Sequence, residues 1–343
     1  MIGTGASPVS MAVTVGSFFA RHGFLVVLAV TAAFFSLVAD HFLSGGNLLA
    51  MLHTMAPVVA IAGGMALVVL MGKLDISVGS IAFLSVSVGV LLIENAGLHP
   101  VLAFAATMLC GGLLGALNGF IVVVLGINPL ITTLGTMIAL RGIALQLTNA
   151  SVIPLPEGVR RLGNLSAGPI FVDILVIGLV LLAAHVLHTR TPFGRQLNAI
   201  GNGEEVAARL GVPVRRTVFA AFVLSGLLAS IGGIASVLQV GSLTAFLGQG
   251  AEFTAVAVVV VGGISLFGGR GALIPGVVLG AFTFEMIQNG LNQIGANPYA
   301  YRLVTGALIF LAMYADALRA GLPSVARTLG HAKGGAARVG ATR

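Results

Sequence analysis

The residues whose side chains could bind a ligand or take part in chemistry are the polar ones that interrupt long apolar segments of this sequence. Four of them recur at intervals of three or four positions, which would place them on one face of a helix: Glu285, Gln288, Asn289 and Asn292. A charged side chain at membrane depth needs a partner, which makes Glu285 a functional candidate. We expect Arg141 or Arg302 as that partner. A structural ion pair is our first interpretation, with a hydrated path or an outer docking contact as alternatives.

A second group of side chains offers hydroxyl, amide and carboxyl groups to a hydroxylated solute. Combined with part of the first group, it gives the candidate translocation path or gate: Asp75, Ser77, Asn118, Asn128, Thr133, Arg141, Glu285 and Asn289. The alternative is that such groups bond their own helix or a neighbouring one. For Asp75, that alternative is capping of the helix that follows it.

The residues of a catalytic or metal site do not recur at the required spacing. No cluster of His, Cys and carboxylates has ligand spacing, and no Ser, His and Asp set is recognisable. A phosphate-binding loop needs a lysine followed by Ser or Thr, whereas Lys73 and Lys333 precede Leu74 and Gly334. We therefore predict no catalytic residue, no metal and no cofactor on this chain, and no ATP hydrolysis by it.

The elements that position these residues must be membrane helices. Of 343 residues, 57% are hydrophobic and 8% are charged, and the mean hydropathy is +1.08, whereas soluble domains carry about 25% charged residues. Apolar segments of the ~20 residues needed to cross a bilayer recur along the chain. We predict an all-α polytopic bundle with about ten spans, at 23–39, 48–71, 76–93, 100–125, 128–148, 170–188, 216–239, 251–267, 271–292 and 300–318.

The distribution of positive charge predicts the orientation. With an even number of spans both termini share a side, and thirteen Lys and Arg residues fall there, against only Arg160 and Arg161 opposite. We therefore expect both termini in the cytoplasm of a bacterial cell, with the chain in its cytoplasmic (inner) membrane. Nucleic-acid binding is excluded because no basic stripe is interleaved with exposed aromatics. Residues 1–320 form the predicted transmembrane domain, and 321–343 a basic, disordered cytoplasmic tail.

Glycine spacing and a short internal sequence similarity lead to two local predictions. Gly111, Gly115 and Gly119 lie four residues apart, so one helix face is flat and another helix is expected to pack there, the alternative being generic membrane filler. Residues 72–76 and 262–266 each begin with glycine, end a valine-rich run and place Asp or Ser before the next apolar segment. We interpret this pair as a weak internal repeat.

The longest polar connection, residues 190–216, contains a helix of its own. Asn202 is expected to cap it with Glu205 reaching back, Glu205 and Arg209 form an i,i+4 pair, and the helix ends before Gly211. A helix of about two turns is marginal alone in water, so 202–210 needs a surface to dock on. A cytoplasmic partner protein is the first candidate, and the lipid interface is the alternative.

Several motifs carry a specific resemblance. They are Gly72–Ser80, Thr133–Thr136 with Arg141–Gly142, Ala199–Asn202, Ala208–Gly211 and Gly262–Gly271, and together they are specific. The match spans nearly the whole chain. The sequence resembles the membrane permease subunit of ATP-binding-cassette (ABC) importers for monosaccharides, the ribose, xylose, arabinose and galactose class. Lys73 departs from the pattern, because the family usually has a small residue there.

The resemblance implies the partners and the role of the polar connection. It implies a ten-helix importer half, a second permease subunit (an identical copy or a homologue), cytoplasmic ABC ATPases that hold ATP and Mg, and an extracytoplasmic substrate-binding protein. By this resemblance the helix at 202–210 is the coupling helix in the ATPase cleft. The residues expected to couple are Arg195, Asn202, Glu204, Glu205, Arg209 and Gly211. A permease for nucleosides, branched-chain amino acids or sugar alcohols, and a self-powered carrier, remain the alternatives.

Overall fold

The computed structural model describes residues 25–297, 299, 300, 303–311, 313, 314, 316 and 317. Within them, six helices are long and apolar enough to cross a membrane: α2 (Gly45–Val69), α3 (Val78–Ala96), α4 (Pro100–Val123), α5 (Pro129–Thr148), α7 (Val172–Arg190) and α10 (Val214–Val240). The helix α12 (Leu273–Gln293) has 21 residues, and the helix Leu25–Val38 and α11 (Ala251–Val261) are shorter. The predicted polytopic helical bundle is confirmed. The predicted tail 321–343 lies outside the described residues.

The eighth predicted span, 251–267, is corrected by the structure. Its helix, α11, ends at Val261 after 11 residues, which is about 16 Å at 1.5 Å per residue and half of a ~30 Å hydrocarbon core. Gly262 follows as the C-cap, and Gly263 has a φ of 85°. A helix cannot continue through this conformation, so the apolar run exceeds the helix it contains.

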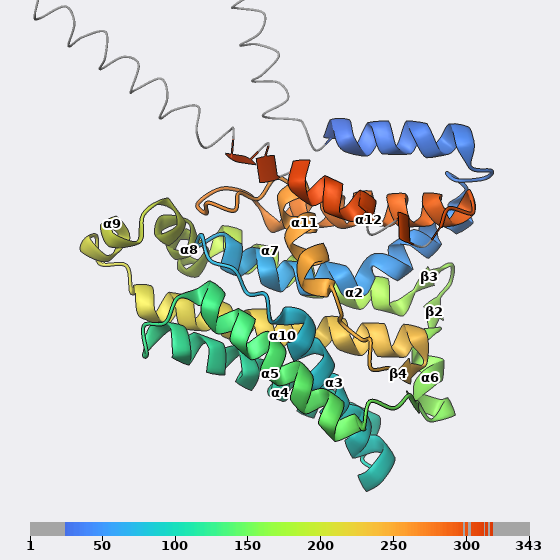
Figure 1. Cartoon of the computed structure of the whole chain (residues 1–343), viewed down its shortest axis with the longest axis horizontal. Helices are drawn as coiled ribbons and strands as arrows, with labels where there is room; N and C mark the ends of the chain where they lie inside the picture. Colours follow the sequence, from blue (N-terminus) through green and yellow to red (C-terminus); the bar gives the residue numbers. More distant parts are fainter. Residues whose placement is uncertain (1–24, 298, 301–302, 312, 315, 318–343) are drawn as a thin grey trace, which may run out of the picture.

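The bundle has two distinct ends, which Figure 1 places at left and right. One end carries the short helices α8 (Pro192–Asn202) and α9 (Glu204–Arg209), and is called the α9 end below. The other carries α6 (Glu157–Gly163) and is called the α6 end. At the α6 end, β1 (Ile153–Pro154) pairs antiparallel with β4 (Ser242–Leu243), and β2 (Ser166–Ala167) with β3 (Ile170–Phe171).

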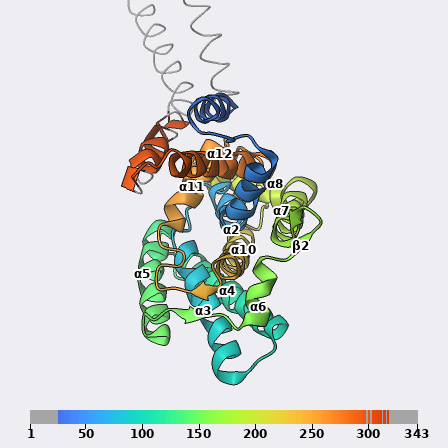
Figure 2. The same cartoon turned by 90° about the vertical axis from the view of Figure 1, so that its right-hand side faces the viewer.

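The helix α10 runs through the centre of the bundle and packs against α4, α2 and α3 (Figure 2). The glycine strip of α4 lies on it: Gly111 faces Ser230, Gly115 faces the backbone of Phe222, and Gly119 faces Phe219. Residues of α2 and α3 are mostly buried, whereas most residues of α4, α5 and α7 are partly or fully exposed. The core is therefore α2, α3 and α10, and the surrounding helices present apolar surface outward.

Local sequence explains where the helices begin and end. Pro129 opens α5, where its missing amide hydrogen costs nothing, and Asn128 accepts a hydrogen bond from Leu130 N at 2.9 Å. Asn149 ends the same helix with a φ of 50°. At the α6 end, the Asp173 carboxylate lies 2.9 Å from His53 Nδ1 and accepts from Gln239 Nε2 at 2.7 Å. This network joins the ends of α2, α7 and α10.

Candidate coupling junction and polar path

Three connections that are distant in sequence meet at the α9 end. Leu70 O, after α2, accepts a hydrogen bond from Gly269 N, before α12, at 2.8 Å. Gly201 of α8 lies against both, since a Cβ there would stand 2.1 Å from Leu70 O and 2.3 Å from Gly269 N. Only glycine fits this position. We call this meeting point, defined by Leu70, Gly201, Asn202 and Gly269, the junction.

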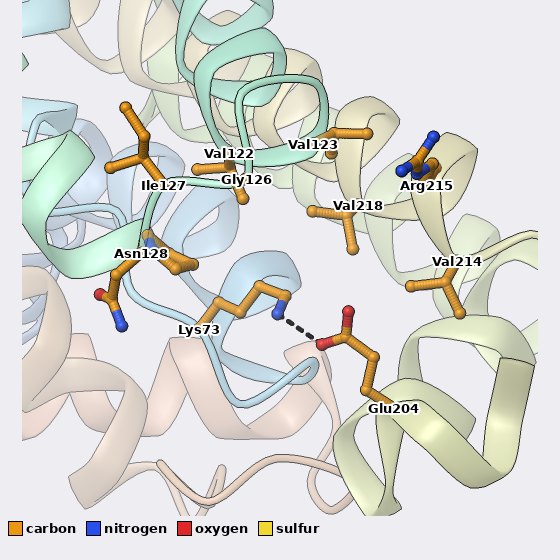
Figure 3. Close-up of a pocket in the computed structure, with 11 residues that line it drawn as sticks. Lys73, Val122, Val123, Gly126, Ile127, Asn128, Glu204, Val214, Arg215 and Val218 are labelled. Carbon is orange, nitrogen blue, oxygen red and sulfur yellow. Dashed lines mark hydrogen bonds and ion pairs between the residues drawn. The ribbon is translucent and has the colours of Figure 1, made fainter.

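An ion pair ties α9 to the same place. Lys73 Nζ donates to Glu204 Oε2 at 2.7 Å, with Lys73 15% exposed and Glu204 53% exposed. The pair borders a cavity of about 290 Å³ that Asn128, Arg215 and several valines also line (Figure 3). Half-exposed pairs contribute about 1 kcal/mol or less to stability. Its geometry therefore matters more than its energy, because it fixes the first residue of α9 to the 70–77 connection.

The predicted capping of 202–210 is corrected. Asn202 is the last residue of α8, and α9 begins after Gly203 without a side-chain cap bond. The Asn202 amide is occupied elsewhere: its Nδ2 donates to Asn198 O at 2.8 Å and to Gly269 O at 3.4 Å. The polar connection therefore contains two helices instead of one. Asn202, which was expected to cap the second helix, instead ends the first and bonds Gly269 at the junction.

The outer surface of α9 carries both charged and apolar side chains, and no other described segment of the chain covers them. Glu205 and Arg209 form the expected i,i+4 pair at 3.9 Å, with both side chains largely exposed. Val206 is 61% exposed and Leu210 is 79% exposed. Gly211 follows with a φ of 83°. Arg195 is exposed on α8. A rigidly anchored helix with exposed apolar side chains at the tip of a bundle is suited to bind a partner.

A buried hydrogen-bond network is formed by the same 70–77 connection that brings Leu70 to the junction. Asp75 is fully buried and accepts from Ser77 N at 3.1 Å, Ser77 Oγ at 2.5 Å and Ser225 Oγ of α10 at 2.9 Å. Asn118 Nδ2 of α4 donates to Ser77 Oγ at 2.7 Å. Burial raises the pKa of the Asp75 carboxyl, and the hydrogen bonds from Ser77 and Ser225 oppose that rise. The structure therefore gathers Asp75, Ser77 and Asn118 into one network between α3, α4 and α10.

Thr133 and Asn128 lie beside this network without entering it. Thr133 Oγ1 donates to Pro129 O at 3.0 Å and reaches Leu74 O at 3.4 Å, which ties α5 to the 70–77 connection. Asn128 caps α5 and lines the cavity of Figure 3. The 70–77 connection is thus held by α5, α9 and α10 together.

The expected pairing of Glu285 with Arg141 is corrected. Glu285 Oε1 accepts from Thr54 Oγ1 of α2 at 2.6 Å, whereas Arg141 Nη2 donates to Leu247 O at 3.4 Å and its guanidinium lies over the Phe83 ring. The two helices α5 and α12 lie on different sides of the core, which no sequence pattern indicated. Asn289 bonds Asn47 of α2 at 3.0 Å. Arg302, the other expected partner, lies outside the described residues.

Sequence reasoning missed three residues that the structure places in or beside these connections. Ser225 sits among apolar residues of α10 and gave no signal. Asp316 accepts from Leu266 N at 2.9 Å and from Ser265 Oγ at 3.2 Å, and so fixes the 262–272 connection between α11 and α12. Glu252 is 7% exposed, and its Oε2 has no hydrogen-bond partner among the described residues. The internal repeat did contain a signal, because Asp75 and Ser265 each accept from the amide two residues on.

Among the described residues, no group of three or more His, Cys, Asp and Glu side chains is arranged to hold a metal ion. The described site consists of packed connections, hydrogen bonds and ion pairs.

Comparison with known proteins assigns the family. Residues 47–313 match the family described as branched-chain amino acid transport system / permease component. The probable ABC transporter permease protein YphD of Escherichia coli (strain K12) is 37% identical over 91% of this chain and 95% of its own length. The ribose import permease protein RbsC of the same strain is 34% identical over 85% of this chain and 92% of its own, and the D-allose transport system permease protein AlsC is 34% identical over 88% and 93%. No solved structure matches the chain.

The chain belongs to this family of multi-pass membrane permeases. It is one component of a larger transport system. The resemblance stated from the sequence motifs is confirmed.

Proposed function

We propose that this chain is the permease subunit of a binding-protein-dependent ABC importer for a monosaccharide or a related polyol. It lies in the bacterial cytoplasmic membrane with the α9 end toward the cytoplasm. The observation that carries the proposal is α9 itself, a helix that is anchored through Lys73 and the junction while Val206 and Leu210 remain exposed. ATP and Mg belong to the partner ATPase that receives α9.

The coupling mechanism follows from what the junction connects. Movement imposed on α9 by ATP binding reaches the 70–77 connection through the Lys73–Glu204 pair and reaches the 262–272 connection through Asn202. These connections lead into α3 and α12, so both helices shift together. Packed elements with two discrete arrangements carry such a change better than a flexible linker would. Rocking between inward and outward states then alternates access to the path.

A second permease subunit completes the path in this proposal. Most residues of the helices α4, α5 and α7 are partly or fully exposed, and large apolar surfaces of this kind face lipid or another membrane subunit. An identical copy or a homologue serves equally, and the exposed face of α5 is the surface we assign to it, because Arg141 lies at the edge of that face.

The substrate class rests on the relatives. Their printed names include ribose and D-allose permeases, which supports a monosaccharide, while the family description names branched-chain amino acids. A thermal-shift screen of the cognate binding protein with pentoses, hexoses, polyols, nucleosides and branched-chain amino acids separates these classes. Stabilisation by a sugar or polyol supports the proposal, and stabilisation only by amino acids or nucleosides contradicts it.

Co-purification separates an ABC importer from a self-powered carrier. We expect a soluble ATPase to remain bound to the wild-type chain through purification, and to be lost when residues 203–211 are replaced by a Gly-Ser linker. Ion-driven uptake by the chain alone, without any bound ATPase, would contradict the proposal.

A further inference from the structure

The segment between β4 and α11 is non-helical backbone at membrane depth. The strand β4 ends at Leu243 at the α6 end, and α11 begins at Ala251. Because α11 is only 11 residues long and leads to the junction at the α9 end, its first residue stands about half a membrane away from that end. Figure 1 shows α11 between the two ends. Residues 244–250 therefore descend into the bundle, where irregular backbone persists only if it is buried in protein or lines a polar path.

The descending segment meets one face of α3. A Cβ on Gly79 would lie 2.3 Å from Gly248 O and 2.6 Å from Glu252 Oε2, so glycine is required for this contact. Phe83 lies four residues further along α3, and its ring is 5.4 Å from Arg141 Cζ. Positions four apart share a helix face and are separated by about 6 Å along the axis. Glu252 and Arg141 are thus held about one helical turn apart over the same face.

The two charged groups are left incompletely satisfied. Glu252 is more than nine-tenths buried, with Oε2 unpartnered, and the one described hydrogen bond of the Arg141 guanidinium is the 3.4 Å contact with Leu247 O. No direct ion pair joins these two described side chains. If the two residues formed a structural ion pair, each charged group would be the partner of the other. A buried carboxylate oxygen without a partner instead points to a bridging group that the chain does not supply.

We propose that Arg141 and Glu252 form a contact site for the hydroxyl groups of a neutral sugar in transit, at mid-depth of the path. The Glu252 carboxylate accepts hydroxyl protons, and the Arg141 guanidinium, held over Phe83, donates to a hydroxyl or ring oxygen of the same molecule. A neutral ligand suits the pair because the two opposite charges already balance. Arg141 is only partly buried at the edge of the exposed face of α5, so the site is reachable from the subunit surface. This inference rests on the proposed function and assigns its substrate contacts.

The test uses the full complex of permease, ATPase and binding protein in proteoliposomes. Uptake of the transported monosaccharide is compared with uptake of its deoxy analogues, each at saturation of the binding protein. The variants are Glu252→Gln and Arg141→Lys, and the control is Glu94→Gln, the same change on an exposed residue of α3. Losing a hydrogen bond to a charged group corresponds to roughly a tenfold rate effect. We expect wild type and Glu94→Gln to transport one deoxy analogue about tenfold more slowly than the parent sugar. The glutamine carbonyl accepts only an uncharged hydrogen bond, roughly half as strong, so we expect Glu252→Gln to reduce that discrimination to about threefold.

A purely structural role would lower uptake of every sugar equally, so unchanged discrimination in an assembled Glu252→Gln complex overturns the proposal. If Glu252→Gln does not assemble, Arg141→Lys carries the same comparison on a more exposed side chain. Wild type that discriminates between no sugars also overturns it. Absence of any sugar uptake by wild type is a different result, because it refutes the proposed function itself.

Discussion

Lys73 and Glu204 are 131 residues apart in the sequence, and their side chains meet at 2.7 Å. Lys73 follows α2, and Glu204 is the first residue of α9. The pair therefore joins the helix proposed to contact the ATPase to the connection that carries the buried Asp75 network. A lysine that departs from the family pattern thus has a partner in this chain.

Reversing one charge of this pair should uncouple the transporter. Lys73→Glu or Glu204→Lys places like charges together, and we expect each to lower the stimulation of ATP hydrolysis by sugar-loaded binding protein to less than about half, the pair being worth ~1 kcal/mol. The double reversal should restore most of it. Glu157→Lys, which reverses one charge of the exposed Glu157–Arg161 pair at the α6 end, is the control. Full stimulation in both single variants would remove the pair from the coupling mechanism.

The exposed apolar residues of α9 should carry ATPase binding. Leu210→Asp places a charge where a partner surface is expected to be apolar, and apolar anchors of interfaces are worth ~2 kcal/mol or more. We expect the ATPase retained on affinity-purified permease to fall by more than about tenfold. Leu165→Asp, at a leucine near the α6 end that is 50% exposed, should retain it. Retention by Leu210→Asp at the wild-type level would mean that α9 lies on lipid or solvent instead.

Gly201 should be intolerant of the smallest side chain. Alanine normally favours a helix over glycine by about 1 kcal/mol, but at Gly201 the added methyl overlaps Leu70 O and Gly269 N. Overpacking of this kind costs ~1–3 kcal/mol, so Gly201→Ala should lower the Tm in detergent by several degrees. Gly178→Ala on α7, where a Cβ meets nothing within 4 Å, should leave the Tm unchanged or raise it. Equal Tm values for the two variants would show that the junction is loose.

Glu285 should tolerate neutralisation. Its described partner is the Thr54 hydroxyl at 2.6 Å, and the carbonyl oxygen of glutamine accepts the same hydrogen bond. We expect Glu285→Gln to give a folded yield in detergent close to that of wild type, as measured by size-exclusion chromatography. A charge exchange between Glu285 and Arg141 should not rescue either single reversal. A strong rescue would show that Glu285 and Arg141 do form the ion pair expected from the sequence.

Apolar run length determined most of the fold in advance. The runs around α2, α4, α5, α7 and α10 lie within a few residues of the helices observed, because length and hydropathy are the properties that a membrane selects. The run 251–267 misled, since valine-rich composition does not reveal that glycine conformations end α11 at Val261.

The sequence predicted many of the residues of the site, but only some of the contacts between them. The grouping of Asp75 with Ser77 follows from their spacing, and Glu205–Arg209 follows from helix geometry. The partners of Lys73, Glu285 and Arg141 lie on other elements, and one sequence does not state which helices adjoin. Glu252 was overlooked because a single carboxylate beside glycines resembles an ordinary helix start, and only burial distinguishes it.

The proposed function is import of a monosaccharide, driven by an ATPase that binds α9. The most direct measurement is uptake of labelled monosaccharide into proteoliposomes that contain the purified complex. ATP is supplied on the side of the membrane that α9 faces, and the binding protein is supplied on the opposite side. Uptake that requires both ATP and the binding protein, and that is lost when 203–211 is replaced, is the predicted result. Uptake that proceeds without ATP, or that survives replacement of 203–211, would contradict the account.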